Sequence, residues 1–290
     1  MSGDYRFIEQ LDGGWRDSGA DLPCADKEDH QGDESHLLTV DEIAEQLARA
    51  KPDSCVILLR SSEVFFSRFA ADEVEGTRNL QTAANHQTLA FRFEEDLPFD
   101  AEQLACDFRL AGESGDQFVT AMGTRIHTLE PLIQTLQSRG IPVRGVCPWI
   151  VLTAQAIVRS ESLNPEGCLV FRRPTGWSFI AWREHQLVGW RIGIADRAGR
   201  SELKLFLHEH GIEGDAYLVS VDETGDSAES TSGSDSIADF EFLPKRISPT
   251  GHSASVAALL DSKEELWCDF RRDPRLNRST ASKITPQLLF

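Results

Sequence analysis

The sequence has few of the residues that would assign it to several large classes of protein. Its six cysteines are scattered over 290 residues, at positions 24, 55, 106, 147, 168 and 268, and no two form a Cys-x-x-Cys pair. This spacing favours buried, reduced thiols over a disulfide framework or a zinc site. The longest nearly apolar stretch, residues 146–158, contains Pro148, Thr153 and Gln155 and is too short to span a bilayer. The opening MSGDYRF shows neither the charged nor the apolar region of a signal peptide, so none is predicted.

Positive charge is also scarce. The chain carries 29 Lys and Arg against 47 Asp and Glu, a net charge of −18, which argues against binding nucleic acid or an anionic membrane through its whole surface. Residues 1–50 and 222–241 account for −16 of this charge. Within them, residues 20–35 and 222–239 are polar, acidic and without apolar periodicity, so we predict an irregular loop and an irregular linker there.

The sign of the charge reverses near the C-terminus. Across residues 271–283 a single acid, Asp273, accompanies a group of basic residues: Arg271, Arg272, Arg275, Arg278 and Lys283. A basic cluster before an apolar end is typical of the cytoplasmic flank of a membrane helix, and an ordinary basic tail explains it equally well.

The first half of the chain alternates predicted strands and helices. Asp12-Gly13-Gly14 marks a hairpin turn between residues 5–11 and 15–17, and Thr39 with Glu42 forms a capping box that starts a helix. A proline after Leu97 ends a second helix, and Pro148 opens a helix that is apolar on most faces. The predicted helices are 40–50, 74–96, one that starts near residue 126 and stops at Gly140, and 148–160, and the strands are 55–59, 64–69, 104–110, 118–122 and 143–146.

The second half begins with three strands that follow one another directly, at residues 168–171, 177–182 and 186–194. A helix over 201–210, a strand over 217–221, a strand over 240–243, a helix over 255–260 and a strand over 266–270 are predicted to follow. This order is typical of an α/β protein with mixed sheets rather than a doubly wound parallel sheet.

No candidate site stands out from the residues alone. His208-Glu209-His210 could suggest a metal pair, but residues two apart on a helix point to different faces, and His210 before Gly211 is better interpreted as a cation at a helix C-terminus. Glu94-Glu95-Asp96 is better interpreted as a solvated face than as a general acid/base pair. The segment 248–253 is a plain helix cap rather than an anion site. The tryptophans at 149, 177, 182 and 190 favour core packing over a ligand box. Nucleotide-loop and hydrolase motifs are absent from the sequence.

Several segments, in their order and spacing, resemble one family. LAFRFEEDLPFDAEQLACDFRL from Leu89 contains the central residues of the resemblance: Glu94, Glu95, Leu97, Pro98, Phe99 and Asp100. CVILLRSSEVFFSRF precedes it, and SRGIPVRGVCPWIVLTAQAI, GWSFIAWREHQLVGWRI and LWCDFRRDPRLNR follow. Over residues 5–194 and 265–290 this order is similar to that of the cytoplasmic actin-like domain of type II secretion system protein L, also called general secretion pathway protein L.

The resemblance implies an actin-like, ribonuclease-H-like fold in two halves with mixed sheets. It predicts a first half over residues 1–160, a second half over 161–270 and a basic juxtamembrane-like tail over 271–290. It implies a non-catalytic scaffold at the cytoplasmic face of the bacterial inner membrane. Such a scaffold docks the N-terminal domain of the secretion ATPase and other platform proteins, and can form a homodimer. Nucleic acid is not an expected partner.

The chain departs from the family in three ways. The first strand, normally upstream of Tyr5–Leu11, is expected to be shortened or missing. The membrane helix and periplasmic domain that follow in the family are absent from the sequence, which suggests a truncated chain. The acidic linker 222–239 is long.

The nucleotide-binding turns of the actin-like class differ as well. Such ATPases hold phosphates with two hairpin turns that carry acids and glycines, and need a carboxylate for Mg²⁺. Asp12, Gly13 and Gly14 form at most a degenerate first turn, and the second, residues 171–176, contains no acid. We therefore expect no cofactor and no enzymatic activity. An ATP-binding actin-like pilus assembly protein is the alternative, and an unrelated α/β protein is a weaker one.

Overall fold

The computed structural model describes residues 4–20, 37–73, 80, 82–112, 117–173, 176–194, 199–219, 243, 245–247, 252–262 and 264–276. The predicted linker at 222–239 and, apart from Ala20, the predicted loop at 20–35 lie outside this range. The helices are α1 (Val40–Ala50), α2 (Ala83–Glu94), α3 (Ile126–Ser138), α4 (Trp149–Ser160), α5 (Gly199–Glu209) and α6 (His252–Asp261). The strands are β1 (Tyr5–Leu11), β2 (Gly14–Gly19), β3 (Ser54–Leu59), β4 (Val64–Ala70), β5 (Leu104–Ala111), β6 (Phe118–Arg125), β7 (Val143–Pro148), β8 (Glu166–Arg173), β9 (Gly176–Arg183), β10 (Gln186–Ile194), β11 (Asp215–Val219) and β12 (Lys245–Ile247).

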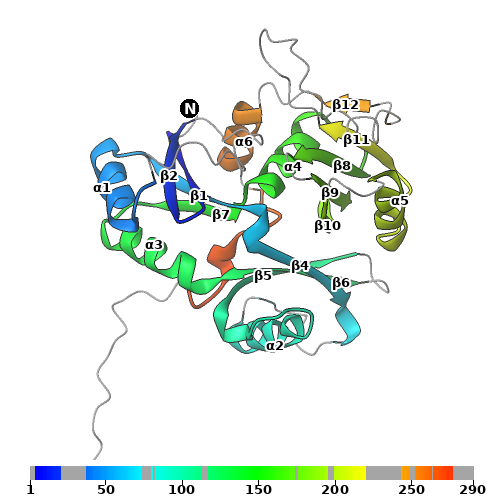
Figure 1. The fold of residues 1–290 in the computed structure, drawn as a ribbon, viewed down its shortest axis with the longest axis horizontal. Coiled ribbons are helices and arrows are strands. Elements are labelled where there is room, and N and C mark those ends of the chain that lie inside the picture. The colour runs from blue at the N-terminus through cyan, green and yellow to red at the C-terminus, as the bar shows by residue number, and fades with distance from the viewer. Residues whose placement is uncertain are drawn as a thin grey trace, which may run out of the picture.

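A four-stranded sheet in the order β2-β1-β3-β7 forms the first layer. β3 is buried along its whole length, as its apolar run SCVILL predicts for a central parallel strand. Helices α1 and α3 lie on one side of this sheet and α4 and α6 on the other (Figure 1). The predicted capping box is present, because Thr39 accepts from the Glu42 backbone N–H while the Glu42 side chain accepts from Thr39. It starts α1 so that Ile43, Ala44 and Leu47 face the core.

A five-stranded sheet in the order β10-β9-β8-β11-β12 forms the second layer. The predicted three-strand meander is confirmed, since β8, β9 and β10 pair antiparallel in sequence. Trp177 and Trp182, five residues apart on β9, face opposite sides: Trp177 belongs to the core cluster that contains Phe206 of α5, and Trp182 belongs to the main core. Trp149 and Trp190 are buried in that core too, so core packing of all four tryptophans is confirmed.

The two sheets repeat one topology. In the first, the strand β1 pairs antiparallel with the next strand, β2, and parallel with β3, which pairs parallel with β7. In the second, the strand β8 likewise pairs antiparallel with the next strand, β9, and parallel with β11, which pairs parallel with β12. β1 is therefore the first strand of its half, and the expectation of a missing strand upstream of Tyr5–Leu11 is wrong. The reduced strand is instead the third, where a single antiparallel bridge joins Trp15 to Leu38.

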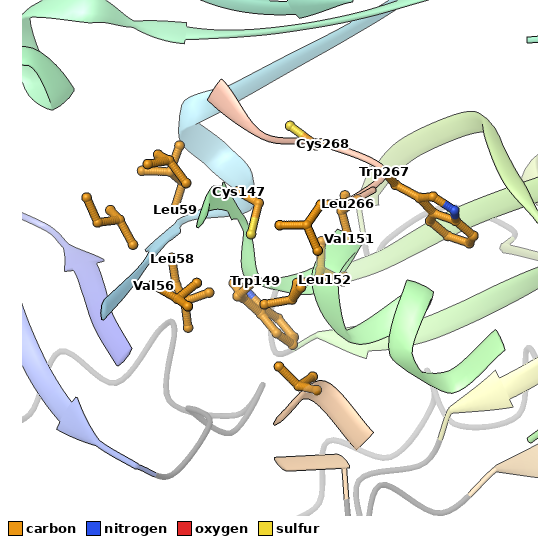
Figure 2. Packing of buried hydrophobic residues seen from close by; sticks show 14 of the residues in the cluster. Val56, Leu58, Leu59, Cys147, Trp149, Val151, Leu152, Leu266, Trp267 and Cys268 are labelled. Atoms are coloured by element: carbon orange, nitrogen blue, oxygen red, sulfur yellow. The ribbon is translucent and has the colours of Figure 1, made fainter. Parts of the chain in front are cut away.

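Helix α4 lies between the two sheets, which explains why every residue from Trp149 to Val158 is buried. Figure 2 shows side chains of β3, of α4 and of the C-terminal segment that contains Leu266 and Trp267 gathered in one apolar cluster. The helix begins one residue later than predicted, because Pro148 is the last residue of β7 and the N-cap of α4.

A smaller sheet in the order β4-β6-β5 carries α2 on its outer face (Figure 1). The predicted antiparallel pairing of residues 104–110 with 118–122 is confirmed. Helix α2 lies within the predicted 74–96 but starts at Ala83 rather than at residue 74, because Thr82 caps it by accepting from the Asn85 N–H at 3.4 Å. Residues 74–79 and 81 lie outside the described range.

Two strands predicted in the last part of the chain, at residues 266–270 and 240–243, are not found as predicted in the described residues. Residues 266–270 do not form a strand: their backbone runs between β5 and β7 and ends in a 3-10 turn at Phe270–Arg272. Side chains take the place of a strand ladder there, as when Gln155 Oε1 accepts from Trp267 N–H at 2.7 Å. Of the predicted strand 240–243 only Leu243 is described, and the short strand β12 was not predicted.

Candidate functional site

The two hairpin turns that would hold a nucleotide occupy equivalent positions in the repeated halves. Leu11 pairs with Gly14 at the end of β1, and Arg173 pairs with Gly176 at the end of β8, so each loop has two residues. The first loop is Asp12-Gly13, and Gly13 has a φ of 83°, a conformation that favours glycine. The second is Pro174-Thr175, which contains neither an acid nor a glycine.

The Asp12 carboxylate is already engaged. It is 90% exposed and forms an ion pair with Arg60, which follows β3 and is 13% exposed. A guanidinium beside the one carboxylate of the turns repels a divalent cation from it. Among the described residues no group of three or more His, Cys, Asp or Glu side chains is placed to hold a metal ion. The turns therefore offer no paired carboxylates for Mg²⁺.

The segment Glu94–Asp100, which contains the central residues of the resemblance, comprises the last residue of α2 and the turn after it. Glu94 accepts from the Ala101 N–H at 2.9 Å, which fixes the turn, while Glu95 is exposed and pairs with Arg92 at 3.1 Å. Leu97 and Phe99 are half-buried, and the Phe99 ring lies 5.2 Å from that of Phe65 on β4. Pro98 and Asp100 are exposed. The segment therefore holds α2 to its sheet and presents acids outward.

The C-terminal segment contains a feature that the sequence analysis missed: two Asp-x-Arg units, Asp269–Arg271 and Asp273–Arg275, four residues apart. The first binds the free edge of the four-stranded sheet at β7. Asp269 Oδ1 accepts from Val146 N–H at 3.2 Å, and Arg271 Nη1 donates to Val143 O at 2.8 Å. Within the unit, Arg271 also donates to Asp269.

The second unit repeats this arrangement on the free edge of the three-stranded sheet at β5. Asp273 Oδ2 accepts from Cys106 N–H at 2.9 Å, and Arg275 donates to Leu104 O and to Asp273. Burial alone would raise the pKa of the Asp273 carboxyl, but the bonds from Arg275 and the Cys106 N–H outweigh it and lower that pKa below its ordinary value. We call the segment Asp269–Arg275 the clasp, because it joins the edges of two different sheets.

A third buried pair fastens the clasp to β5. Arg272 Nη1 lies 2.8 Å from Asp107 Oδ2, and the same oxygen accepts from Asp269 N–H at 2.9 Å. Residues 271–276 are thus part of the folded body, which corrects the expectation that a basic tail begins at residue 271. Arg278 and Lys283 lie outside the described residues. The repeated Asp-x-Arg spacing in DFRRDPR was the signal that could have indicated this role.

Of the His208-Glu209-His210 group, His208 is exposed and His210 lies against β10 and β4. Arg68 Nη1 lies 3.3 Å from His210 Nδ1, and the ring packs on Phe206 at 4.6 Å. Burial, with Arg68 and Arg191 nearby, lowers the pKa of His210 to about 4, although Glu209 partly opposes this. His210 is therefore neutral at pH 7, and its predicted role as a cation at the helix end is wrong.

We expect the free energy of unfolding to fall as the pH drops from about 6.5 to about 4. In this range the unfolded chain binds a proton at His210 more readily than the folded chain does. The stability that the neutral ring contributes is therefore fully present above the pKa of His210 in the unfolded chain, and it is lost as the pH falls towards the pKa in the folded chain. Because the ring is partly exposed, solvent screening reduces the effect to roughly 1–2 kcal/mol. Urea unfolding at about pH 7 and about pH 5 measures it. A His210→Gln variant should lose less stability between the two, and an equal loss would contradict the assignment.

The repeated strand order and the equivalent turns define an α/β protein of the actin-like class, as predicted from the sequence. No protein-family model matches the chain, and no curated protein matches it in sequence. Among solved structures, a chain of the PilM-PilN type IV pilus biogenesis complex is similar at 10% identity and a TM-score of 0.56, covering 90% of this chain and 100% of that one. Similarity at this identity establishes the fold.

Two further structures are similar over most of the chain. One is the cytoplasmic domain of EpsL, an inner-membrane component of the type II secretion system of Vibrio cholerae, at 14% identity, a TM-score of 0.48, and 91% and 98% coverage of this chain and that one. The other is a Bacteroides thetaiotaomicron protein with an actin-like ATPase fold and unknown function, at 10% identity, a TM-score of 0.45, and 89% and 96% coverage. None of the helices in the described part of the chain has the length and hydropathy needed to cross a bilayer.

Proposed function

We propose that the chain is a non-catalytic scaffold of a type II secretion or related pilus platform, held at the cytoplasmic face of the inner membrane. In this role it docks the N-terminal domain of the secretion ATPase and contacts other platform proteins. Three observations support this proposal: the order and spacing of the segments that resemble the family, the actin-like fold, and the likeness to a chain of the PilM-PilN complex. We also propose the division into halves at residues 160–167, next to the end of α4.

The proposal that the chain is non-catalytic rests on the acidic residues of the two turns. Asp12 is the one acid in them and is paired with Arg60, while the equivalent loop Pro174-Thr175 has no acid. A Mg-nucleotide site usually takes one or two carboxylates from the protein besides the phosphates, because Mg²⁺ prefers oxygen ligands, and the one candidate here, Asp12, is already paired with Arg60. The geometrically intact Asp12-Gly13 loop keeps an ATP-binding actin-like protein as the alternative.

Two measurements separate these functions. Binding of the cognate ATPase N-terminal domain is expected, and Mg-ATP is expected to leave the melting temperature unchanged. A nucleotide present at a hundred times its dissociation constant would stabilise the folded chain by about 2.7 kcal/mol. Tight Mg-ATP binding without binding of the ATPase domain would favour the alternative.

The acidic linker 222–239 is proposed to speed the encounter. Much of the net charge lies in it and in residues 1–50, so a partner with a basic face would associate faster at low salt. Association rates measured across ionic strength, with and without residues 222–239, test this. An association rate that changes with neither the salt concentration nor the deletion would show that the linker has no role in recruiting the partner.

A further inference from the structure

The outer face of α2 presents an aromatic side chain to solvent. Phe91 is 45% exposed, although most large apolar side chains of the described residues are buried. The other exposed positions before it on the helix include Ala84, Gln87 and Thr88, none of which is charged. An uncharged face of more than two helical turns is unusual on a chain with a net charge of −18.

Phe91 lines two separate hollows. One has a volume of about 450 Å³ and lies between α2 and the end of the clasp, with Ala84, Ala90 and Pro274 among its lining residues. The other has a volume of about 270 Å³ and lies over the turn after α2, against Leu97 and Phe99. We call Phe91 the ridge, because it is exposed and borders both of these partly apolar hollows, each of which a partner side chain can fill.

Carboxylates surround this ridge. Glu94, Glu95 and Asp100 line the smaller hollow, and Glu102 lines the larger. Arg92 pairs with Glu95 and Asp96 and offsets one charge of this group, while Arg275 is paired with Asp273 in the clasp. The rim therefore carries an excess of negative charge around an apolar centre.

The ridge is rigidly mounted. On the opposite face of α2, Leu89 and Phe93 are fully buried, and the Phe93 ring packs edge-on against Phe108 of β5 at 6.4 Å. His86 packs on the same Phe108 ring at 4.9 Å. A helix fixed in this way loses little conformational freedom on binding, which favours affinity.

We propose that the surface formed by Phe91, its two hollows and the surrounding acids docks a partner helix that carries an apolar side chain flanked by Lys or Arg. The apolar anchor would fill a hollow against Phe91, and the basic side chains would meet Glu94, Glu95, Asp100 and Glu102. This inference rests on the proposed scaffold function and locates its docking surface. The acidic rim selects a basic partner, since a partner with the same sign of charge would be repelled.

The test measures binding of the cognate ATPase N-terminal domain to the full chain and three variants. Phe91→Ala is expected to weaken binding at least tenfold, because it removes the centre of the surface. Glu95→Lys combined with Glu102→Lys should weaken it and lower its dependence on salt. Leu205→Ala is the matched control: Leu205 is 54% exposed on α5 and lies away from this surface, so binding should be unchanged.

Each outcome has a definite meaning. If the unaltered chain binds and Phe91→Ala binds equally well, the location is wrong while the scaffold function stands. If the unaltered chain does not bind, the scaffold function fails and this inference fails with it. Sedimentation of the chain alone provides a further check. A dimer that Phe91→Ala turns into a monomer would assign the face to a second copy and overturn the proposal. An unchanged melting temperature in all three variants shows that the fold is intact.

Discussion

Replacing Asp273 with alanine is expected to lower the free energy of unfolding by about 3–5 kcal/mol, the usual effect of removing one partner of a buried ion pair. The carboxylate is fully buried and accepts hydrogen bonds from Arg275 and from the Cys106 N–H at the edge of β5. Its loss leaves a partly buried guanidinium without its carboxylate and an edge N–H without its acceptor. Denaturant unfolding of the unaltered chain and the variant measures the difference.

Two comparisons make this prediction specific. Glu45→Ala removes an exposed pair with Arg49 on α1 and should cost only about 0.5 kcal/mol or less. The double variant Asp273→Ala, Arg275→Ala should cost less than the sum of its single variants, because no buried charge is left unpaired. Equal costs for Asp273→Ala and Glu45→Ala would show that the clasp does not hold the two sheets together.

Replacing Trp182 with alanine is expected to destabilise the chain by about 3–5 kcal/mol, the range for removing a large buried aromatic side chain. Trp182 is fully buried, donates from Nε1 to Asn164 O at 3.0 Å and lies 6.1 Å from the Tyr217 ring. The ring also packs over Gly167, where an added Cβ would lie 2.7 Å from it. The side chain therefore extends from β9 across β8 towards β11 on one face of the sheet.

Thermal or denaturant unfolding of Trp182→Ala measures this cost. Trp182→Phe should recover much of the stability, since it keeps an aromatic ring and loses the hydrogen bond and part of the volume. Trp177→Ala should also be costly, and should report on the other face of the same strand, against α5. A small effect of Trp182→Ala would mean that Trp182 has a role other than core packing.

The errors of the sequence analysis have common physical causes. The strand predicted at residues 266–270 has the right apolar pattern, but its backbone groups are met by the side chains of Asp107 and Gln155, which are distant in sequence. His210 was predicted to be charged from its place at a helix end, yet contacts with β4 and β10 make it neutral. In each case a long-range contact outweighed a correctly recognised local pattern.

The sequence by itself determined the local elements and the class of the fold. The capping box at Thr39, the hairpin at Asp12-Gly13 and the meander of β8 to β10 depend on neighbouring residues, and such interactions can be inferred from spacing. The acid-free second turn is likewise a property of the sequence.

Only the tertiary structure decided how distant parts are joined. The basic cluster at residues 271–275 is part of a clasp because β7 and β5 present their free edges to it. Val146 of β7 donates to Asp269 across 123 residues of sequence, and Cys106 of β5 donates to Asp273 across 167. Phe91 is a ridge because α2 packs its other face on the three-stranded sheet. Charge in a sequence does not reveal its partner, since pairing depends on which strands end up as edges and which faces stay uncovered.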